Sequence, residues 1–111
     1  MSKELERYVN VRIAAGEARE QDKIKESNNF MTEVYDIYTL LKNENRLDEF
    51  KDLLLHENPY VRLSAAIRCL QFDDTVDESV EILEKFAKSD KTLGHEAHMT
   101  LFAWRNGMIK F

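Results

Sequence analysis

Residues 53–70 read LLLHENPYVRLSAAIRCL, and this stretch decides the fold. A leucine-rich segment ends in a polar turn, and Asn58 and Pro59 then open a new apolar pattern. An asparagine side chain can accept hydrogen bonds from the first free amides of a helix. Proline suits the first helical position because its missing amide would have no intrahelical partner there. The stretch therefore predicts two helices joined by a short turn, with Asn58 capping a second helix that starts at Pro59.

The helix that starts at Pro59 has an apolar stripe at helical spacing. The stripe consists of Leu63, Ala66, Ile67 and Leu70. Ala65 and Ala66 are small, so a neighbouring helix can approach closely at this point.

The same periodicity predicts further helices on both sides of this stretch. They cover residues 2–19, 22–42 and 46–55 before it and residues 76–89 and 94–106 after it. Only one proline and three glycines punctuate the 111 residues, which favours long helices with short connections. We predict an all-α chain of about six helices that forms a single domain over residues 1–111.

Three local patterns predict where helices begin or end. Asn45 followed by Asp48 resembles an N-terminal cap, and Thr75 with Glu78 has the spacing of a capping box. Gly107 suits the left-handed position that follows a helix. Together these patterns predict tight connections.

Two of the predicted helices differ in how their apolar residues are distributed. The helix over residues 22–42 is amphipathic, and its expected stripe is Ile24, Met31, Val34, Tyr35, Tyr38 and Leu41. The last helix is apolar on more than one side, through Met99, Leu101, Phe102, Ala103 and Trp104. Such a helix is normally buried between neighbours. The alternative is a contact with a partner or with a second copy of the chain.

Charge and cysteine content narrow the classes of function. The formal net charge is −5, whereas nucleic-acid binding depends on clustered Lys and Arg, so nucleic acid is not an expected partner. No apolar run approaches the roughly 20 residues that a membrane span requires. Cys69 is the single cysteine, which excludes an intramolecular disulfide, and residues 1–10 are too charged for a secretory signal. We expect a cytoplasmic protein.

Nearly the whole chain follows one longer pattern: a helical hairpin, then Leu-Leu-x-His-x-Asn-Pro-x-Val-Arg-x-x-Ala-Ala, then Met-x-Leu-x-x-Trp-x-x-Gly. This pattern resembles a family of small bacterial HEAT-like proteins of unknown function. The matching positions are His56, Asn58, Pro59, Val61, Arg62, Ala65, Ala66, Leu70, Met99, Leu101, Trp104 and Gly107. The resemblance implies that two HEAT-like hairpins follow the N-terminal one in a short right-handed stack. It also implies that Arg62 bonds to turn carbonyls or to an acidic side chain between repeats.

No residues have the spacing of a catalytic or metal site. His95 and His98 are three apart, whereas His-Glu-x-x-His metalloproteases use a spacing of four and a third ligand. A metal-dependent enzyme using this pair is the unfavoured alternative to His95 capping a helix start, His98 lying at the surface and His56 belonging to the turn before Pro59. Cys69 has no neighbouring base and is typical of a small buried apolar residue. We expect no catalytic residue, metal or cofactor.

Six acidic residues precede the first lysine after residue 72. They are Asp73, Asp74, Asp77, Glu78, Glu81 and Glu84. Asp77, Glu81 and Glu84 share one helical face by their spacing. One explanation is a solvated face, because acids in a first turn complement the helix dipole. The alternative is a docking surface for a basic partner.

These observations favour a non-enzymatic protein-interaction module that binds a protein with a basic surface. Trp104 is a further candidate contact. An immunity-type protein that neutralises a toxin is the concrete version of this prediction. An adaptor or regulatory subunit without toxin involvement is the alternative.

Overall fold

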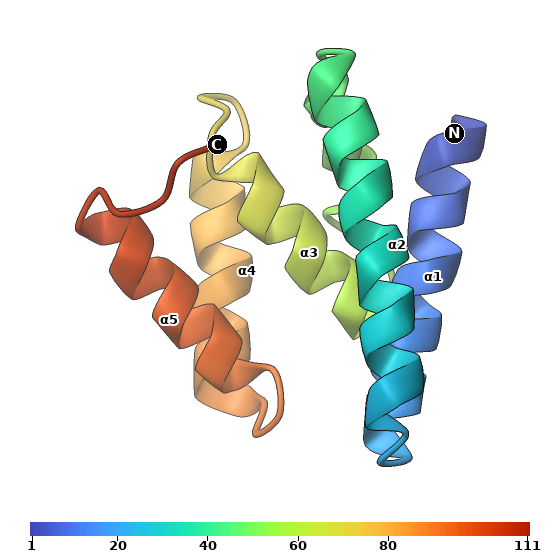
Figure 1. Ribbon diagram of the computed structural model, residues 1–111. Helices are drawn as coiled ribbons and strands as arrows, with labels where there is room; N and C mark the ends of the chain where they lie inside the picture. The colour runs from blue at the N-terminus through green and yellow to red at the C-terminus, as the bar shows by residue number, and fades with distance from the viewer. The chain divides into compact units, whose positions relative to one another are not determined.

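The computed structural model describes residues 1–111 and is all-helical, as predicted. The helices are α1 (Lys3–Glu20), α2 (Ile24–Asn43), the 3₁₀ helix η1 (Leu47–Leu53), α3 (Pro59–Cys69), α4 (Val76–Ser89) and α5 (Gly94–Arg105) (Figure 1). Backbone contacts divide the chain into two compact units, residues 1–49 and 50–111, and η1 crosses the boundary. We call them the N-terminal and C-terminal units. None of the helices combines the length and the apolarity needed to cross a membrane.

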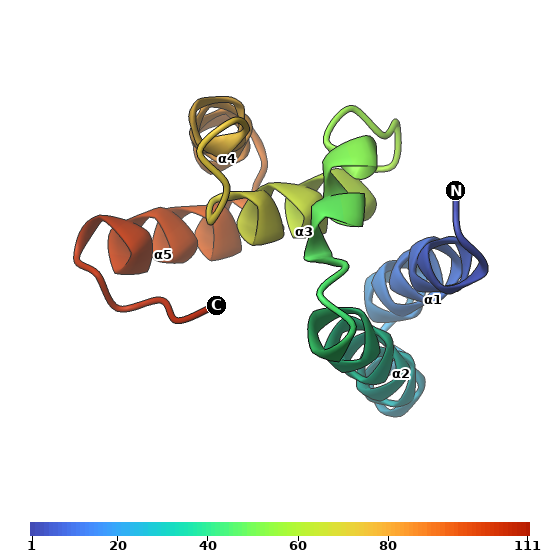
Figure 2. The same cartoon turned by 90° about the horizontal axis from the view of Figure 1, so that it is seen from above.

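The N-terminal unit is a hairpin in which α1 packs against α2, and the two helices lie side by side in both views (Figures 1 and 2). Its buried apolar residues are Leu5, Tyr8, Val9, Val11, Ala15, Ala18, Val34, Leu41 and Leu47. One buried polar contact joins the helices: the Ser27 hydroxyl donates to the backbone oxygen of Ala15 at 2.9 Å. This bond satisfies a hydroxyl that would otherwise be costly to bury.

The predicted apolar stripe of α2 is buried only in part. Val34 and Leu41 are buried, whereas Ile24 and Tyr35 are each more than half exposed. At 100° per residue, Ile24 and Tyr35 lie at one edge of the stripe, about a quarter turn or more from Val34 and Leu41. The predicted stripe is therefore buried along one edge and exposed along the other.

Three helices end on a residue in the left-handed backbone region. Gly107 has φ 66°, as predicted, and Asp22 and Asn45 take the same conformation with φ 58° and 57°. Asn45 therefore ends α2, and the prediction that it caps the following helix was wrong. Asp and Asn tolerate this region better than other non-glycine residues, which lets them replace glycine at a helix end.

The third predicted helix is shorter than expected and is the 3₁₀ helix η1. Only three residues separate α2 from its start, and the Arg46 amide still bonds back to the Leu41 oxygen at 2.8 Å. At seven residues η1 is long for a 3₁₀ helix, which is mostly used in shorter pieces. Its apolar residues nevertheless reach the core, since Leu47, Phe50 and Leu53 are buried.

The C-terminal unit is built on α4, which packs against both α3 and α5. Its buried apolar residues are Phe50, Leu53, Leu54, Tyr60, Val61, Leu63, Ala65, Ala66, Cys69, Leu70, Leu83, Phe86, Leu93, Ala97 and Leu101. The start of α5 approaches α4 closely at Gly94. A Cβ there would lie 2.8 Å from the Phe86 backbone oxygen, so a larger residue would force the helices apart.

The beginning of α3 is built as the sequence predicts. The Asn58 side-chain oxygen accepts from the amides of Tyr60 at 3.0 Å and Val61 at 3.3 Å, and Pro59 occupies the first helical position. Asn58 itself is held by His56, whose Nδ1 accepts from the Asn58 amide at 3.0 Å. His56 thus belongs to the turn before Pro59, as expected.

The start of α4 differs from the predicted capping box. Thr75 does precede the helix, but its side chain makes no capping bond. Its hydroxyl instead donates to the Cys69 backbone oxygen at 3.0 Å. The hydroxyl thereby satisfies a carbonyl at the end of α3, and the predicted pairing of Thr75 with Glu78 was wrong.

Candidate interaction surface

Arg62 has the structural role that was expected of it. Its Nη1 donates to the backbone oxygens of His56 at 2.8 Å and Glu57 at 3.3 Å. The guanidinium also lies 5.1 Å from the ring centroid of Phe86 on α4. Arg62 therefore ties α3, the turn before it and α4 together, and its partly buried side chain is occupied by these contacts.

The acidic residues around the start of α4 lie at the surface. Glu84 is partly buried and the other five are exposed: Asp73, Asp74, Asp77, Glu78 and Glu81. The inner face of α4 is formed by Ser79, Leu83 and Phe86. The carboxylates thus lie away from the core.

Three of the six carboxylates have a cation beside them. Lys51 Nζ lies 3.0 Å from Asp74, Lys85 lies 3.4 Å from Glu81, and Arg105 lies 3.8 Å from Glu84. The Lys51 ammonium also lies 4.6 Å from the ring centroid of Phe72. These pairs reduce the acidic charge available to a partner.

The remaining carboxylates, Asp73, Asp77 and Glu78, are exposed and form no ion pair. Asp77 and Glu78 lie in the first turn of α4, where the helix dipole favours negative charge. Lys88 occupies the last turn of the same helix, which is the complementary arrangement. The solvated-face explanation therefore accounts for where the acids are placed, while their charge remains accessible.

The last helix is buried on one face only. Ala97 and Leu101 are buried against the unit, Trp104 is half-buried, and Met99 and Phe102 are 50% and 53% exposed. The expectation that α5 is buried between neighbours was therefore wrong for its outer face. Trp104 lies at the edge of the core, and part of its side chain is exposed to solvent.

His95 and His98 are both exposed on α5. The residue that caps this helix is Leu93, and the Asp90 carboxylate accepts from the Leu93 amide at 2.7 Å, so the prediction that His95 is the cap was wrong. His98 does lie at the surface. No group of three or more His, Cys, Asp and Glu side chains is arranged to hold a metal ion.

Cys69 and Ser79 are two fully buried groups that could in principle act as nucleophiles. Burial raises the pKa of the Cys69 thiol to about 12, which keeps it protonated and poorly reactive at neutral pH. The Ser79 hydroxyl is enclosed within α4 and the core, and it has no hydrogen-bond partner. No base activates either group, so both are best explained as parts of the packed interior.

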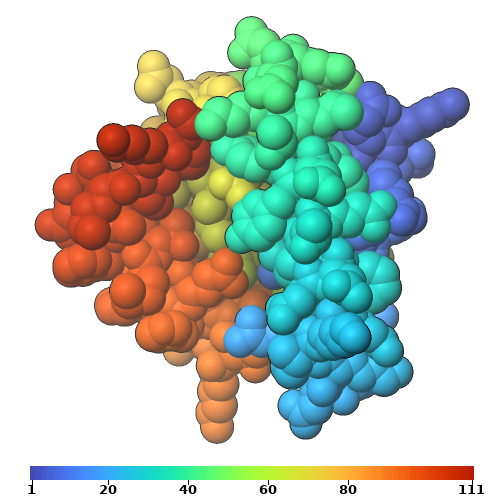
Figure 3. All heavy atoms as spheres, in the orientation of Figure 1, coloured from blue at the N-terminus to red at the C-terminus, as the bar shows by residue number.

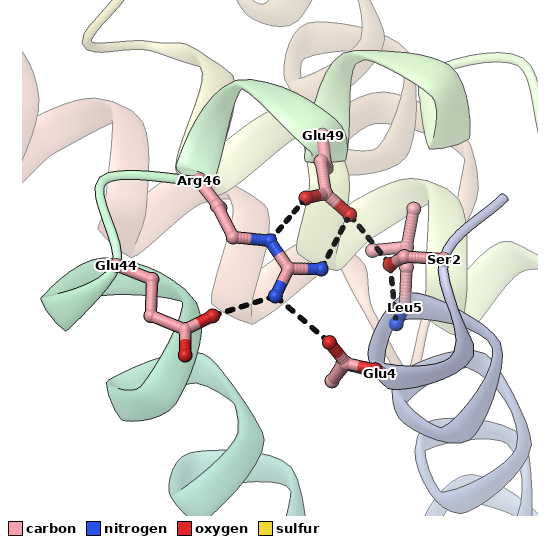
Figure 4. Close-up of polar contacts among 6 residues, drawn as sticks. All are labelled: Ser2, Glu4, Leu5, Glu44, Arg46 and Glu49. Carbon is pink, nitrogen blue, oxygen red and sulfur yellow. Dashed lines mark hydrogen bonds and ion pairs between the residues drawn. The ribbon is translucent and has the colours of Figure 1, made fainter.

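A polar cluster around Arg46 in the N-terminal unit was not predicted from the sequence. Its guanidinium donates to Glu4 at 2.8 Å, to Glu44 at 2.6 Å and to Glu49 at 2.5 Å (Figure 4). These carboxylates come from the first turn of α1, the end of α2 and the start of η1. Arg46 therefore fastens three segments at one end of the hairpin.

The same cluster includes the cap of α1. The Ser2 hydroxyl donates to Glu49 at 2.6 Å and accepts from the Leu5 amide at 3.2 Å (Figure 4). The hydrogen bond from Arg46 is the largest cause that lowers the pKa of both Glu4 and Glu49, and the Ser2 hydroxyl lowers that of Glu49 further. Because every carboxylate in the cluster is already paired, we assign it a structural role.

This cluster makes the stability of the chain sensitive to acid. A carboxylate whose pKa is lowered on folding stabilises the fold above its unfolded pKa, and this contribution is lost as the pH falls. The ordinary pKa of a glutamate side chain is 4.5. The melting temperature should therefore drop as the pH falls below about this value. Arg46→Met should lower the melting temperature at pH near 7, and this difference from wild type should shrink in acid.

Thermal melts followed by circular dichroism between pH about 3 and about 7 measure this difference. Arg19→Met is the matched control, because Arg19 is exposed at the end of α1 and should leave the pH profile unchanged. If Arg46→Met lowered the melting temperature by the same amount at every pH, the assigned pairing of Arg46 with Glu4 and Glu49 would be contradicted.

No family model, no curated protein and no solved structure matches the chain. A function can therefore be inferred only from the geometry and charge of the chain's own residues.

Proposed function

We propose that this chain is a non-enzymatic protein-interaction module that binds a partner with a basic surface. The observation that carries the proposal is the set of three exposed carboxylates without ion pairs, Asp73, Asp77 and Glu78, at the start of α4. Such a set raises the rate at which a basic surface is encountered and favours one orientation of docking.

The way α4 is held supports a binding role for this surface. Its inner face is packed against α3 and α5, and Lys51 pairs with Asp74 just before the helix begins. Asp77 and Glu78 therefore project from a helix that is fixed in its unit. Charges held in place by the backbone lose less conformational freedom on binding than charges on a mobile loop.

An immunity-type protein that neutralises a toxin in a bacterial cytoplasm is the concrete form of this proposal. An acidic helical surface of this kind can cover a basic active cleft. An adaptor or regulatory subunit would use the same surface without a toxin. The two versions differ in whether the captured partner loses an activity when the chain binds it.

The proposal predicts that reversing these three charges abolishes capture of the partner. Tagged chain and the triple variant Asp73→Lys/Asp77→Lys/Glu78→Lys are compared as baits in lysate of the native host, at low and moderate salt. We expect the wild-type chain to retain one stoichiometric basic protein that salt releases. The variant should retain at least about tenfold less of this protein. Each substitution replaces an attraction to the basic surface by a repulsion.

A second triple variant, Glu17→Lys/Glu26→Lys/Asp36→Lys, is the matched control. These residues are exposed in the N-terminal unit, and the substitutions change the net charge by the same amount. Equal loss of capture by both variants would show that only net charge matters, and full capture by the α4 variant would place binding elsewhere. Circular dichroism checks that both variants are folded.

A further inference from the structure

The end of α5 holds the single asparagine of the chain that is followed by a glycine, Asn106 before Gly107. Both residues are exposed, and the segment after α5, coloured red in Figure 3, lies at the surface of the C-terminal unit. Because glycine has no Cβ, its backbone nitrogen can approach a neighbouring side chain more freely than that of any other residue. The side-chain amide of Asn106 therefore has a nucleophile next to it in the backbone.

The backbone after α5 is held in a defined turn. The Gly107 amide donates to the Trp104 oxygen at 3.1 Å, and the Met108 amide donates to the Ala103 oxygen at 2.8 Å. With Gly107 at φ 66°, this pair of bonds is a common left-handed ending of a helix. The nitrogen of Gly107 is therefore engaged with α5 as long as the turn is closed.

The Asn106 side chain is engaged in the same turn. Its Nδ2 donates to the Phe102 backbone oxygen at 2.8 Å, and its backbone amide donates to that oxygen at 3.2 Å. The Gly107 nitrogen and the Asn106 side-chain amide are therefore each bonded to α5, and the closed turn keeps them from reacting with each other.

Opening of this turn requires little disruption of the fold. Local opening costs least at helix ends, where few buried contacts hold the backbone. Met108 is 66% exposed, and no atom lies within 4 Å of the position that a Cβ on Gly107 would occupy. The turn therefore depends on its own hydrogen bonds and is not covered by neighbouring side chains.

We propose that Asn106 is a site of spontaneous deamidation, and that opening of the turn after α5 controls its rate. In the open turn the Gly107 nitrogen attacks Asn106 Cγ and forms a C–N bond. The Cγ–Nδ2 bond breaks, and ammonia leaves with the proton that the Gly107 nitrogen has lost. Water then opens the cyclic imide. Attack of water at Cγ gives aspartate and attack at the backbone carbonyl gives isoaspartate, so the reaction consumes water and releases ammonia.

Deamidation weakens the turn in which it occurs. Aspartate has no side-chain amide to donate to the Phe102 oxygen, and its charge lies beside the last carbonyls of α5, where the helix dipole favours positive charge. Isoaspartate also lengthens the backbone before Gly107. The change is irreversible and makes the net charge of −5 more negative. It needs no partner, so it does not depend on the function proposed above.

Peptide mass mapping of the purified chain tests the site and the role of the turn. The chain is incubated at mildly alkaline pH with and without urea. In the folded chain Asn106 should be converted faster than any other asparagine, and urea should raise its rate at least about tenfold by keeping the turn open. Faster conversion of another asparagine in the folded chain, or no conversion of Asn106 in urea, overturns the proposed site. Equal rates at Asn106 with and without urea overturn the control by the turn.

Gly107→Ala tests the route of the reaction. In urea this variant should convert Asn106 at least about tenfold more slowly, because the alanine methyl group hinders attack by the backbone nitrogen. Measurement in urea removes the strain that alanine meets at positive φ. Met108→Ala is the matched control, because it leaves the attacking nitrogen unchanged. Equal conversion in the two variants overturns the route through the Gly107 nitrogen.

Asn106→Asp reproduces one product of the reaction. It should speed amide hydrogen exchange at Gly107 and Met108 by about twofold or more, because the new charge opposes the helix dipole. Asn29→Asp is the matched control, since Asn29 is exposed in the first half of α2, where the dipole favours negative charge. This control should leave exchange at Gly107 and Met108 unchanged. Equal exchange at these two amides in Asn106→Asp and in the wild-type chain overturns the inferred weakening of the turn.

Discussion

Leu83→Ala should lower the free energy of unfolding by about 3 kcal/mol. Leu83 lies on the inner face of α4 with no exposed surface, in the helix that packs against both α3 and α5. Truncation removes buried apolar area and leaves a cavity that the surrounding helices can fill only partly. Urea denaturation measures the loss, and an unchanged slope against denaturant would show that the unfolding transition itself is preserved.

Leu55→Ala is the matched control for this substitution. Leu55 is 82% exposed, so the same change of side chain should alter the free energy of unfolding by less than about 0.5 kcal/mol. A loss at Leu83 as small as at Leu55 would mean that α4 does not pack tightly within its unit. In that case the exposed carboxylates of α4 would also lack the fixed positions on which the proposed binding depends.

Helix ends were predicted correctly where a residue suits only one position at a helix end. Asn58 and Pro59 are such a pair, and α3 begins at Pro59 as expected. The left-handed turn at Gly107 is another case, since glycine takes positive φ at little cost. The bounds of α4, Val76–Ser89, also agree with the predicted range of residues 76–89, although its predicted cap was wrong.

The errors at Asn45 and Thr75 share a physical cause. Asparagine and threonine can both cap the start of a helix. Asparagine can also end a helix in the left-handed conformation, and a threonine hydroxyl can donate to a free carbonyl. Asn45 adopts the left-handed conformation that ends α2, and the Thr75 hydroxyl donates to the carbonyl of Cys69. The choice between these roles depends on which backbone groups are left unpaired after packing, and local spacing does not contain that information.

For the candidate surface, the sequence predicted which residues are acidic and helical but not which of them are neutralised. Glu81 pairs with Lys85 at the i, i+4 spacing that a sequence shows directly. Asp74 and Glu84 pair instead with Lys51 and Arg105, which lie more than 20 residues away. Only the tertiary structure reveals that the accessible charge is concentrated near the first turn of α4.

The Arg46 cluster was missed for the same reason. Glu44 and Glu49 lie close to Arg46 in the sequence, but Glu4 is 42 residues away, and local spacing does not show that the three carboxylates meet at one guanidinium. Its role follows from the hairpin, which brings the end of α2 back to the first turn of α1. The outer face of α5 shows the opposite error, because apolar residues on several sides of a helix suggested burial where one face stays open.

Arg62→Ala should lower the free energy of unfolding by about 2 kcal/mol, because the guanidinium acts in two ways at once. It donates to the His56 and Glu57 carbonyls, and it lies over the Phe86 ring. Hydrogen bonds from a charged donor account for most of the expected loss, and the ring contact for the remainder. Urea denaturation measures it, with Arg19→Ala as a control that should change little because Arg19 is exposed.

Arg62→Lys separates the two contributions. A lysine keeps the positive charge but offers a compact ammonium in place of the planar fork, so it cannot reproduce both carbonyl contacts together with the ring contact. We expect it to recover less than half of the loss. A double-mutant cycle with Phe86→Leu should give a coupling energy of about 0.5–1 kcal/mol for the ring contact. A coupling energy near zero would mean that Arg62 stabilises only the turn and does not link it to α4.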